Sequence, residues 1–430
     1  MPVDKLVARC GKYGKAALAH PQYPLMKNIA FFSLANLLGN FFAFLFHFYI
    51  ARALTVVEYG AISALIAAFG LFSLPIGSFA ILVVKKVAQD KAKAASVAKG
   101  ALNLSLAFAA TVCFAIIVFS QAFLGFFHLE EWLLVPLFAF GVLLGCVSAA
   151  LNGVLQGLEN FFLSGSSFVA GSLVKLLLGF VLVGALGYGM LGALGAFVAA
   201  IAVSTGIVFC YLFPLLKEKG EPYYFWNMKK DFLVITAISI GMFLALSGDL
   251  IVLGNLFPED ELGFYAAGSM LAKIISYALL PLSAVVFPKM VESAHLKKSS
   301  NVLFVGLALL AVAGAAFLAF YWFFGGFALS FLYSDKYLAG LSYLMVLSLS
   351  VVFYCFNALL SRQFIAERNS FYTIAVLAIP IAGLALLYFI PDISFAPYVM
   401  LGLNAVLFVA SMVLLKNGRM KAAAEAPVIS

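Results

Sequence analysis

Two lysines lie near the middle of long apolar segments of this sequence. Lys175 is about ten residues from either end of segment 165–187, and Lys273 is about eleven residues from the start of segment 262–288. If these segments cross a membrane as helices, each places a charge near the bilayer centre, at a cost of about 2.5–3.5 kcal/mol. We expect such charges to face an anion, with phosphate and carboxylate as the candidates.

One acidic residue lies at a similar depth. Asp249 is about 6 Å in depth from Lys273, so the two could form a salt bridge that only stabilises its half of the protein. Lys175 has no acidic residue at its depth. This asymmetry favours a cavity with net positive charge. Asp249 and His47 are also candidates for binding and releasing the coupling ion, although a buried histidine is more often a hydrogen-bonded packing residue.

Polar residues recur along single faces of three predicted helices. The first face carries Ser33, Asn36, Asn40 and His47, the second Ser167, Gly171, Lys175 and Gly179, and the third Tyr265, Ser269, Lys273 and Tyr277. Spacings of three, four and seven residues put each set on one side of a helix, which should face protein or water and not lipid. Substrate binding and hydrogen bonding between helices both explain the Ser and Asn residues.

The scaffold for these residues must be a membrane bundle. Hydrophobic residues make up 65% of the chain, charged residues 10%, and the mean hydropathy is +1.11. No soluble surface has this composition. The predicted fold is all-α and polytopic, with twelve transmembrane helices. They span residues 27–51, 60–84, 100–124, 133–156, 165–187, 189–214, 232–256, 262–288, 300–324, 338–361, 371–390 and 394–416, the fifth and sixth being joined by a tight turn near Tyr188.

Basic residues set the orientation. With a cytoplasmic N-terminus, 22 of the 26 Lys and Arg residues fall on the cytoplasmic side, and only Arg52 and Lys336 fall outside. The predicted division is a basic cytoplasmic arm (1–26), a first lobe (27–214), a cytoplasmic loop (215–231), a second lobe (232–416) and a cytoplasmic tail (417–430). The loops are short, and no phosphate-binding glycine loop, metal-ligand cluster or nucleophile triad occurs. We therefore expect no cofactor, no metal and no catalytic residue.

The two lobes read as copies of one another. LTVVEYG, ending at Gly60, corresponds to FPEDELG, ending at Gly263, at an offset of 203. LPIGS (74–78) corresponds to LPLSA (280–284) at an offset of 206, which a three-residue insertion would explain. Because six spans are an even number, the repeats would be parallel, and two such lobes enclose a central cavity. Chance similarity between apolar helices is the alternative.

Four segments together resemble the lipid-linked polysaccharide (O-antigen type) flippases of the multidrug/oligosaccharidyl-lipid/polysaccharide exporter superfamily. They are ARALTVVEYGAISAL (51–65), LQGLENF (155–161), SGDLIVLGNLFPEDELGFYAA (247–267) and FLYSDKYLAGLSYLMVLSLS (331–350). Many members of that family line the cavity with arginines. Here the arginines near the spans, Arg52, Arg362 and Arg368, lie at helix ends, so the charged role falls to the two lysines.

The resemblance implies alternating-access transfer of a polyprenyl-diphosphate-linked oligosaccharide from the cytoplasmic to the outer leaflet. It implies a bacterial or archaeal cytoplasmic membrane, with the lipid-linked substrate and membrane lipids as partners. A glycan polymerase or other assembly proteins could join them, and nucleic acid is not expected. A cation-coupled multidrug exporter of the same superfamily is the alternative, and a membrane glycan polymerase or ligase is a weaker one. The first alternative normally needs acidic residues in the cavity, and the second a large outer loop.

Overall fold

The computed structural model describes residues 23–257, 259–295, 301–367 and 370–424. This part of the chain contains helices and short connections, without a strand, and twelve of its helices are long and apolar enough to cross a membrane. The predicted all-α polytopic fold is therefore confirmed, and the chain is a multi-pass membrane protein. The predicted arm (1–26) and tail (417–430) lie outside the residues whose side chains are described.

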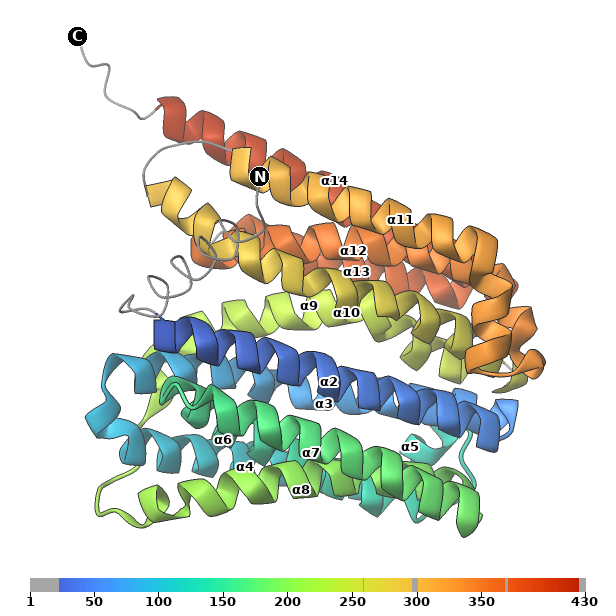
Figure 1. The fold of residues 1–430 in the computed structure, drawn as a ribbon, viewed down its shortest axis with the longest axis horizontal. Coiled ribbons are helices and arrows are strands. Elements are labelled where there is room, and N and C mark those ends of the chain that lie inside the picture. The colour runs from blue at the N-terminus through green and yellow to red at the C-terminus, as the bar shows by residue number, and fades with distance from the viewer. Residues whose placement is uncertain (1–22, 258, 296–300, 368–369, 425–430) are drawn as a thin grey trace, which may run out of the picture.

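The helices form two groups (Figure 1). The first group, here the N-lobe, contains α2 (Tyr23–Ala53), α3 (Val56–Gln89), α4 (Ala94–Val118), α5 (Ser120–Phe126), α6 (Leu134–Gly157), α7 (Phe161–Gly179) and α8 (Gly189–Lys217). The second group, the C-lobe, contains α9 (Lys229–Leu256), α10 (Glu259–His295), α11 (Asn301–Leu332), α12 (Leu341–Glu367), α13 (Ser370–Leu386) and α14 (Ala396–Ala424). Short helical turns are η1 (Lys91–Lys93), η2 (Phe180–Ala185), η3 (Phe225–Met228), η4 (Asp335–Gly340), η5 (Leu387–Phe389) and η6 (Ile393–Phe395).

The two ends of the bundle differ in charge. The basic end holds the loop after α3 and the loop between α8 and α9, with lysines that include Lys85, Lys91 and Lys219. At the opposite end, α2 turns into α3 and α9 into α10. Both α2 and α9 begin at the basic end (Figure 1), so the two lobes are inserted in parallel.

The sequence repeat has a structural counterpart. α3 begins at Val56 and α10 at Glu259, so the second long helix of each lobe starts at the same offset of 203 residues. The two motifs also touch, since a side chain on Gly263 would collide with the carbonyl of Val56. The repeated motifs therefore meet at the boundary between the lobes, at the opposite end.

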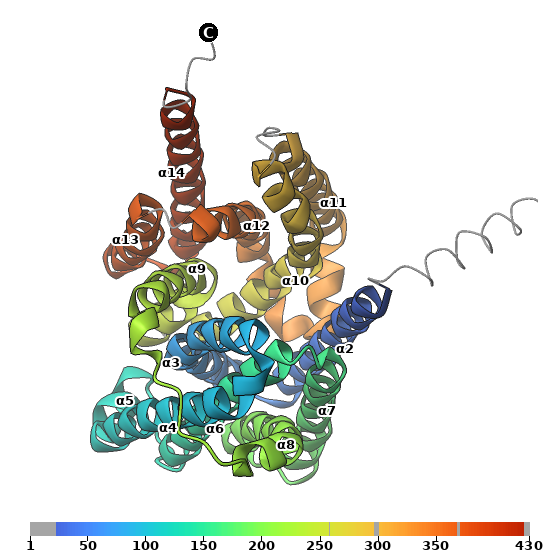
Figure 2. The ribbon, with the colours of Figure 1, turned by 90° about the vertical axis from the view of Figure 1, so that its left-hand side faces the viewer.

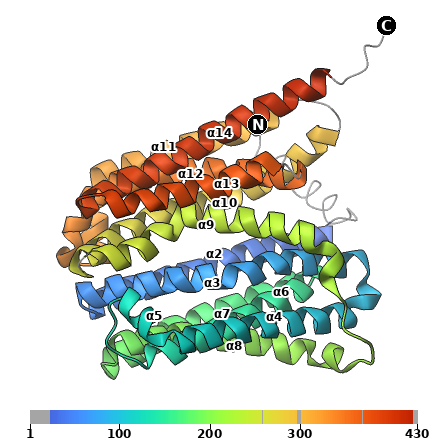
Figure 3. The same ribbon diagram turned by 180° about the vertical axis from the view of Figure 1, so that it is seen from behind.

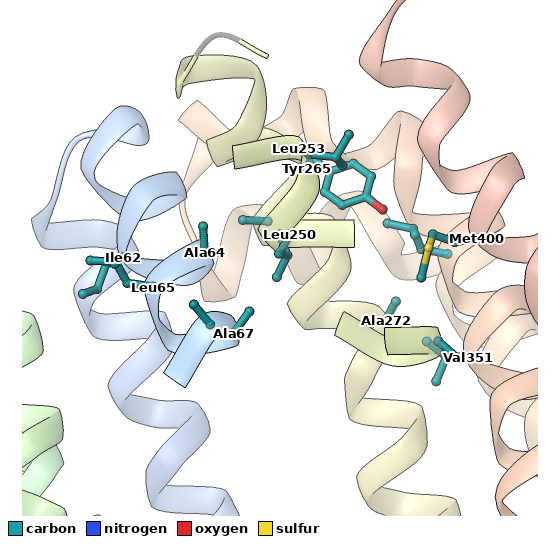
Figure 4. Packing of buried hydrophobic residues seen from close by; sticks show 14 of the residues in the cluster. Ile62, Ala64, Leu65, Ala67, Leu250, Leu253, Tyr265, Ala272, Val351 and Met400 are labelled. Atoms are coloured by element: carbon teal, nitrogen blue, oxygen red, sulfur yellow. The ribbon is translucent and has the colours of Figure 1, made fainter. Parts of the chain in front are cut away.

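Close packing of α3 holds the lobes together. α3 contacts both α9 and α10. Figure 4 shows Ala64 and Ala67 of α3 facing Leu250 of α9, and Gly254 lets the two backbones approach at Ala64. Small residues at such a contact are typical of membrane helices, which associate through close packing and not by hydrophobic exclusion.

The loop from α8 to α9 is attached to the N-lobe at the basic end (Figure 3). The Tyr223 amide donates to the Ser96 carbonyl at 2.9 Å, and the Ser96 hydroxyl donates to the Glu221 carbonyl. Gly100 permits this contact, because a side chain there would strike the Tyr223 backbone. The loop is therefore a strap that is fixed to α4 before the chain enters α9.

Two local features concern the predicted spans. The tight turn at Tyr188 is confirmed: its amide donates to the Leu182 carbonyl at 2.9 Å, and Gly187 has a positive φ of 68° that glycine adopts without strain. The third span begins and ends six residues before the predicted 100–124, since α4 runs from Ala94 to Val118. α4 ends at Val118, and the chain turns into α5, where Phe123 packs on Phe138 of α6 at 5.0 Å between ring centroids. We attribute the bend to this aromatic contact.

Candidate functional site

Lys175 lies inside the N-lobe between aromatic rings. It is 8% exposed, and its Nζ is 5.0 Å from the Phe46 ring of α2 and 5.7 Å from the Phe197 ring of α8. No acidic side chain of the described chain pairs with it. Each contact with a ring face is worth about 2 kcal/mol when desolvated, so the two together are comparable to the insertion cost of about 2.5–3.5 kcal/mol. Lys175 is therefore held by ring faces and without a counter-ion.

Small residues on the same face of α7 create this arrangement. A side chain on Gly171 would meet the Ala200 carbonyl of α8, and one on Gly179 would meet the Phe46 ring. The two glycines let α7 approach α8 and α2 closely enough for the rings to reach Lys175. The predicted face of α7 therefore lies against protein; it carries Ser167, Gly171, Lys175 and Gly179. Its glycines pack helices and its lysine supplies charge.

Lys273 lies inside the C-lobe on a small cavity. The cavity has room of about 10 Å³, enough for about one water molecule. Four helices supply its walls, which are formed by Ala245, Leu246, Asp249, Ser269, Ala272, Lys273, Leu347, Ser350, Val351, Met400 and Asn404. The predicted residues Ser269 and Lys273 therefore line a space within one lobe, and Lys273 is only 4% exposed.

Asp249 does not form an ion pair with Lys273 in the described structure, although its charge acts on the lysine. Its Oδ2 instead accepts a hydrogen bond of 2.6 Å from the Tyr265 hydroxyl, and its buried Oδ1 has no partner. Tyr265 is fully buried and holds Asp249 in place, so it is not exposed to a substrate. The sequence suggested a salt bridge of Asp249 with Lys273 or a role in binding a coupling ion, and the direct salt bridge is not observed.

Sequence reasoning missed the amides that complete this polar core. The Asn404 side chain donates to the Ala245 carbonyl at 2.9 Å and to the Ser350 hydroxyl at 3.1 Å, and Asn357 donates to the Asn404 carbonyl at 2.9 Å. The signal was present as two asparagines within apolar segments, where an unpaired amide is costly. These bonds tie α9, α12 and α14 together behind the cavity.

His47 lies within electrostatic range of both lysines. It is buried on α2, its Nδ1 has no hydrogen-bond partner, and the charges of both Lys175 and Lys273 act on its ring. We call these three residues the cationic cluster. They come from α2, α7 and α10, so the cluster joins both lobes, and no single helical face reveals it.

The other predicted site residues lie around this cluster. The Asn36 amide donates to the Phe32 carbonyl at 2.7 Å, and both Asn36 and Asn40 are partly exposed. Tyr277 is 41% exposed and meets Phe44 edge to face at 5.1 Å. This contact joins α10 to α2 across the lobe boundary. Tyr277 therefore lies beside the boundary, whereas Ser269 and Tyr265 belong to the C-lobe interior.

The two basic residues at the opposite end close the lobes there. Arg52 of α2 donates to the carbonyls of Phe331 and Leu332 at the end of α11. Lys336 of η4 donates in return to the Leu54 carbonyl at 2.6 Å, and the Tyr337 hydroxyl to that of Ala51 at 2.9 Å. Carbonyls at a helix C-terminus lack partners in the helix and attract cations. We call these bonds of Arg52, Lys336 and Tyr337 the latch.

The residues that the structure describes include no group of three or more His, Cys, Asp or Glu side chains placed to hold a metal ion. The cationic cluster would repel a cation. The site's chemistry is that of buried positive charge, neutral hydrogen-bonding groups and aromatic rings.

The fold of this chain is also found in solved structures of transporters. The fold is similar to an inward-facing multidrug resistance MATE family transporter of the MOP superfamily, with a TM-score of 0.72, 16% identity, and coverage of 92% of this chain and 96% of the other. An outward-facing MATE family transporter has a TM-score of 0.66 and 18% identity, with coverage of 93% of this chain and 96% of the other. A MOP superfamily transporter from Pyrococcus furiosus, described as having a binding pocket of reverse polarity, has a TM-score of 0.65 and 18% identity, with the same coverages.

Residues 25–294 match the family described as polysaccharide biosynthesis protein, and the chain belongs to this family. No curated protein matches the sequence. The resemblance to flippases within this superfamily is confirmed at the level of family and fold, and both the family and the similar structures are of transporter type.

Proposed function

We propose that this protein transfers a polyprenyl-diphosphate-linked oligosaccharide from the cytoplasmic to the outer leaflet of a bacterial or archaeal cytoplasmic membrane, for surface polysaccharide assembly. The observation that carries the proposal is the cationic cluster. Two buried lysines, one from each lobe, act on one histidine, and Lys175 has aromatic rings where a counter-ion would stand.

A diphosphate suits this site on energetic grounds. One phosphate charge about 4 Å from an ammonium group gains about 4 kcal/mol at the effective dielectric constant found near protein surfaces. The two ring contacts of Lys175 together are worth about 4 kcal/mol, and a diphosphate carries at least two such charges, so its attraction exceeds them. The cargo can therefore draw Lys175 away from Phe46 and Phe197. Because Lys273 belongs to the other lobe, one bound diphosphate would pull on both lobes.

The latch gives the direction of loading. In this structure the latch joins the lobes at the opposite end, so we assign cargo entry to the basic end, which the charge bias places in the cytoplasm with both termini. Release would require the latch to open and the lobes to rock about the α3 contact. The prenyl tail stays in lipid throughout. A glycan polymerase or another assembly protein would receive the product.

A cation-coupled multidrug exporter is the second candidate, because the similar solved structures include MATE family transporters. Such a protein needs a carboxylate that meets a cationic drug. Among the residues described within the spans, Asp249 is the clear carboxylate, and it is buried, bonded to Tyr265 and under the field of Lys273. This geometry favours an anionic cargo. The short loops likewise give a polymerase or ligase little surface outside the membrane.

Binding and transfer by purified protein test the proposal. Proteoliposomes would receive a fluorescent undecaprenyl-diphosphate-linked oligosaccharide. We expect Lys175→Met and Lys273→Met each to weaken binding by about tenfold, corresponding to about 1.4 kcal/mol, and the double variant to abolish transfer. The matched control is Lys217→Met, which removes a lysine that also lies over a ring, Phe213 at 4.4 Å, but outside the site. Transfer by the double variant at the normal rate would overturn the proposal, as would export of cationic dyes without transfer of this cargo.

A further inference from the structure

A second polar cluster lies in the N-lobe, towards the basic end from Lys175. Ser148, Asn152 and Gln156 follow one another at intervals of four on α6 and so share one face. The Ser164 hydroxyl of α7 donates to the Asn152 Oδ1 at 3.0 Å, and Gln156 donates to Ser164 at 3.5 Å. The Asn152 amide also donates to the Ser148 carbonyl at 3.0 Å. We call these four residues the amide cluster.

The amide cluster faces the interior of the N-lobe. α2 packs on α7, α7 on α8, α8 on α6 and α6 on α3, so these five helices surround the lobe interior (Figure 2). On the same face of α6, a side chain on Gly141 would meet Val198 of α8, and one on Gly145 would meet Ser73 of α3. The face that carries the cluster therefore points between α3 and α8, where Ser164 of α7 meets it.

This interior is polar but almost uncharged. One Lys, Arg, Asp or Glu occurs in the membrane-spanning parts of the five surrounding helices, and it is Lys175. These parts are residues 31–51, 59–84, 134–157, 161–179 and 189–216. The C-lobe interior instead combines Asp249 with Lys273. The N-lobe thus offers one positive charge at one depth and neutral donors and acceptors at another.

The cluster retains hydrogen-bonding capacity. Ser148, Asn152 and Gln156 are all partly exposed, so a ligand can reach them. Gln156 makes one long bond, although a side-chain amide can donate two and accept two. Lipid cannot satisfy these groups, and a solely structural contact would leave much of their capacity unused.

We propose that the amide cluster binds the sugar part of the cargo and that this part is an uncharged, hydroxyl-rich glycan. The inference rests on the proposed function. Asn152 lies five residues from the end of α6 and Lys175 fourteen from the start of α7, both counted from the basic end, so their depths differ by about 13 Å. A diphosphate at Lys175 therefore places its first sugars beside the cluster.

Two lipids separate this inference from the proposed function. One is the undecaprenyl-diphosphate-linked oligosaccharide, and the other is undecaprenyl diphosphate without sugars. Gln156→Met keeps the length of the side chain and removes its polar groups. We expect it to weaken binding of the glycan-bearing lipid by about tenfold and to change binding of the bare lipid by less than about twofold. Asn152→Leu should do the same, and Lys175→Met should weaken binding of both lipids.

The controls distinguish a binding role from a structural one. Asn103→Leu removes an exposed amide from α4 in the same lobe and should leave both affinities unchanged. Thermal unfolding of Gln156→Met in detergent should match the unmodified protein, since that side chain makes only one long bond. Equal loss of both affinities, or no loss of either, in Gln156→Met overturns the inference and leaves the proposed function standing. Failure of the unmodified protein to bind either lipid overturns both.

Discussion

The hydroxyl of Tyr265 decides how Asp249 can act. The Tyr265 hydroxyl donates a hydrogen bond to Oδ2 of Asp249, and Oδ1 is buried without a partner. A buried carboxylate with half its acceptors unused is under electrostatic stress, and losing its remaining donor leaves it uncompensated. We therefore expect Asp249 to turn towards a coupling ion when cargo draws Lys273 away.

Tyr265→Phe tests this at the level of one atom. Removing the hydroxyl should destabilise the protein by about 1–3 kcal/mol, the usual cost of an orphaned buried polar group, and should slow transport. The measurement is the thermal unfolding midpoint in detergent, together with the transfer rate in proteoliposomes. Tyr188→Phe, at an exposed tyrosine, is the control. Adding Asp249→Asn to Tyr265→Phe should lower the free energy of unfolding only slightly further, because the two side chains form one pair. If the losses of the two single variants were fully additive, the pairing would be contradicted.

The bonds of the latch lie at helix ends and not on helix faces. Arg52 binds the C-terminal carbonyls of α11, and Lys336 binds those at the end of α2, so each lobe caps a helix of the other. Hydrogen bonds from charged donors contribute about 1.5–3 kcal/mol each. Arg52 and Lys336 are also the two basic residues that depart from the charge bias of the loops. Their role in the latch accounts for that departure.

Opening of the latch is the prediction at this scale. The double variant Arg52→Ala, Lys336→Ala should lose about 3 kcal/mol of the free energy that favours the closed state. The ratio of closed to open protein should then fall by about a hundredfold. Spin labels at the exposed positions Val57 and Leu338 report the separation of the lobes at the opposite end, and their distance distribution should move to longer values. Lys91→Ala breaks a surface ion pair with Glu159 inside the N-lobe and should leave the distances unchanged. An unaltered distribution in the double variant would show that the latch does not hold this end.

Hydropathy located the helices because lipid cannot hydrogen-bond to the backbone, which leaves long apolar segments only the helical form. The residues that share a helix face were predicted from their spacing alone, because a helix repeats every 3.6 residues. The partners of Lys175 were not predictable. Phe46 and Phe197 come from two other helices, and no spacing rule relates them to the lysine. The amide cluster was readable from its intervals of four on α6, but only packing of α7 shows that it faces inwards.

At the scale of the whole molecule, charge distribution should fix which end loads cargo. Lysines gather at the basic end, and acidic residues such as Glu131 and Glu261 lie at the opposite end. Because Lys and Arg resist translocation, the basic end should be cytoplasmic. The latch joins the lobes at the other end, so cargo made in the cytoplasm would meet the end where the latch does not act. The expected orientation and the position of the latch both favour the direction of transport that we propose.

Labelling of single cysteines tests that orientation. In a cysteine-free background, Glu218→Cys lies in the loop at the basic end and Glu131→Cys at the opposite end, and both positions are exposed. Neither change removes a positive charge, so neither weakens the signal that sets topology. A membrane-impermeant maleimide added to intact spheroplasts should label Glu131→Cys alone, and permeabilised cells should show both. Labelling of Glu218→Cys in intact spheroplasts would show that the protein has the opposite orientation in the membrane. The latch would then face the cytoplasm, and the proposed cargo could not enter from the side on which it is made.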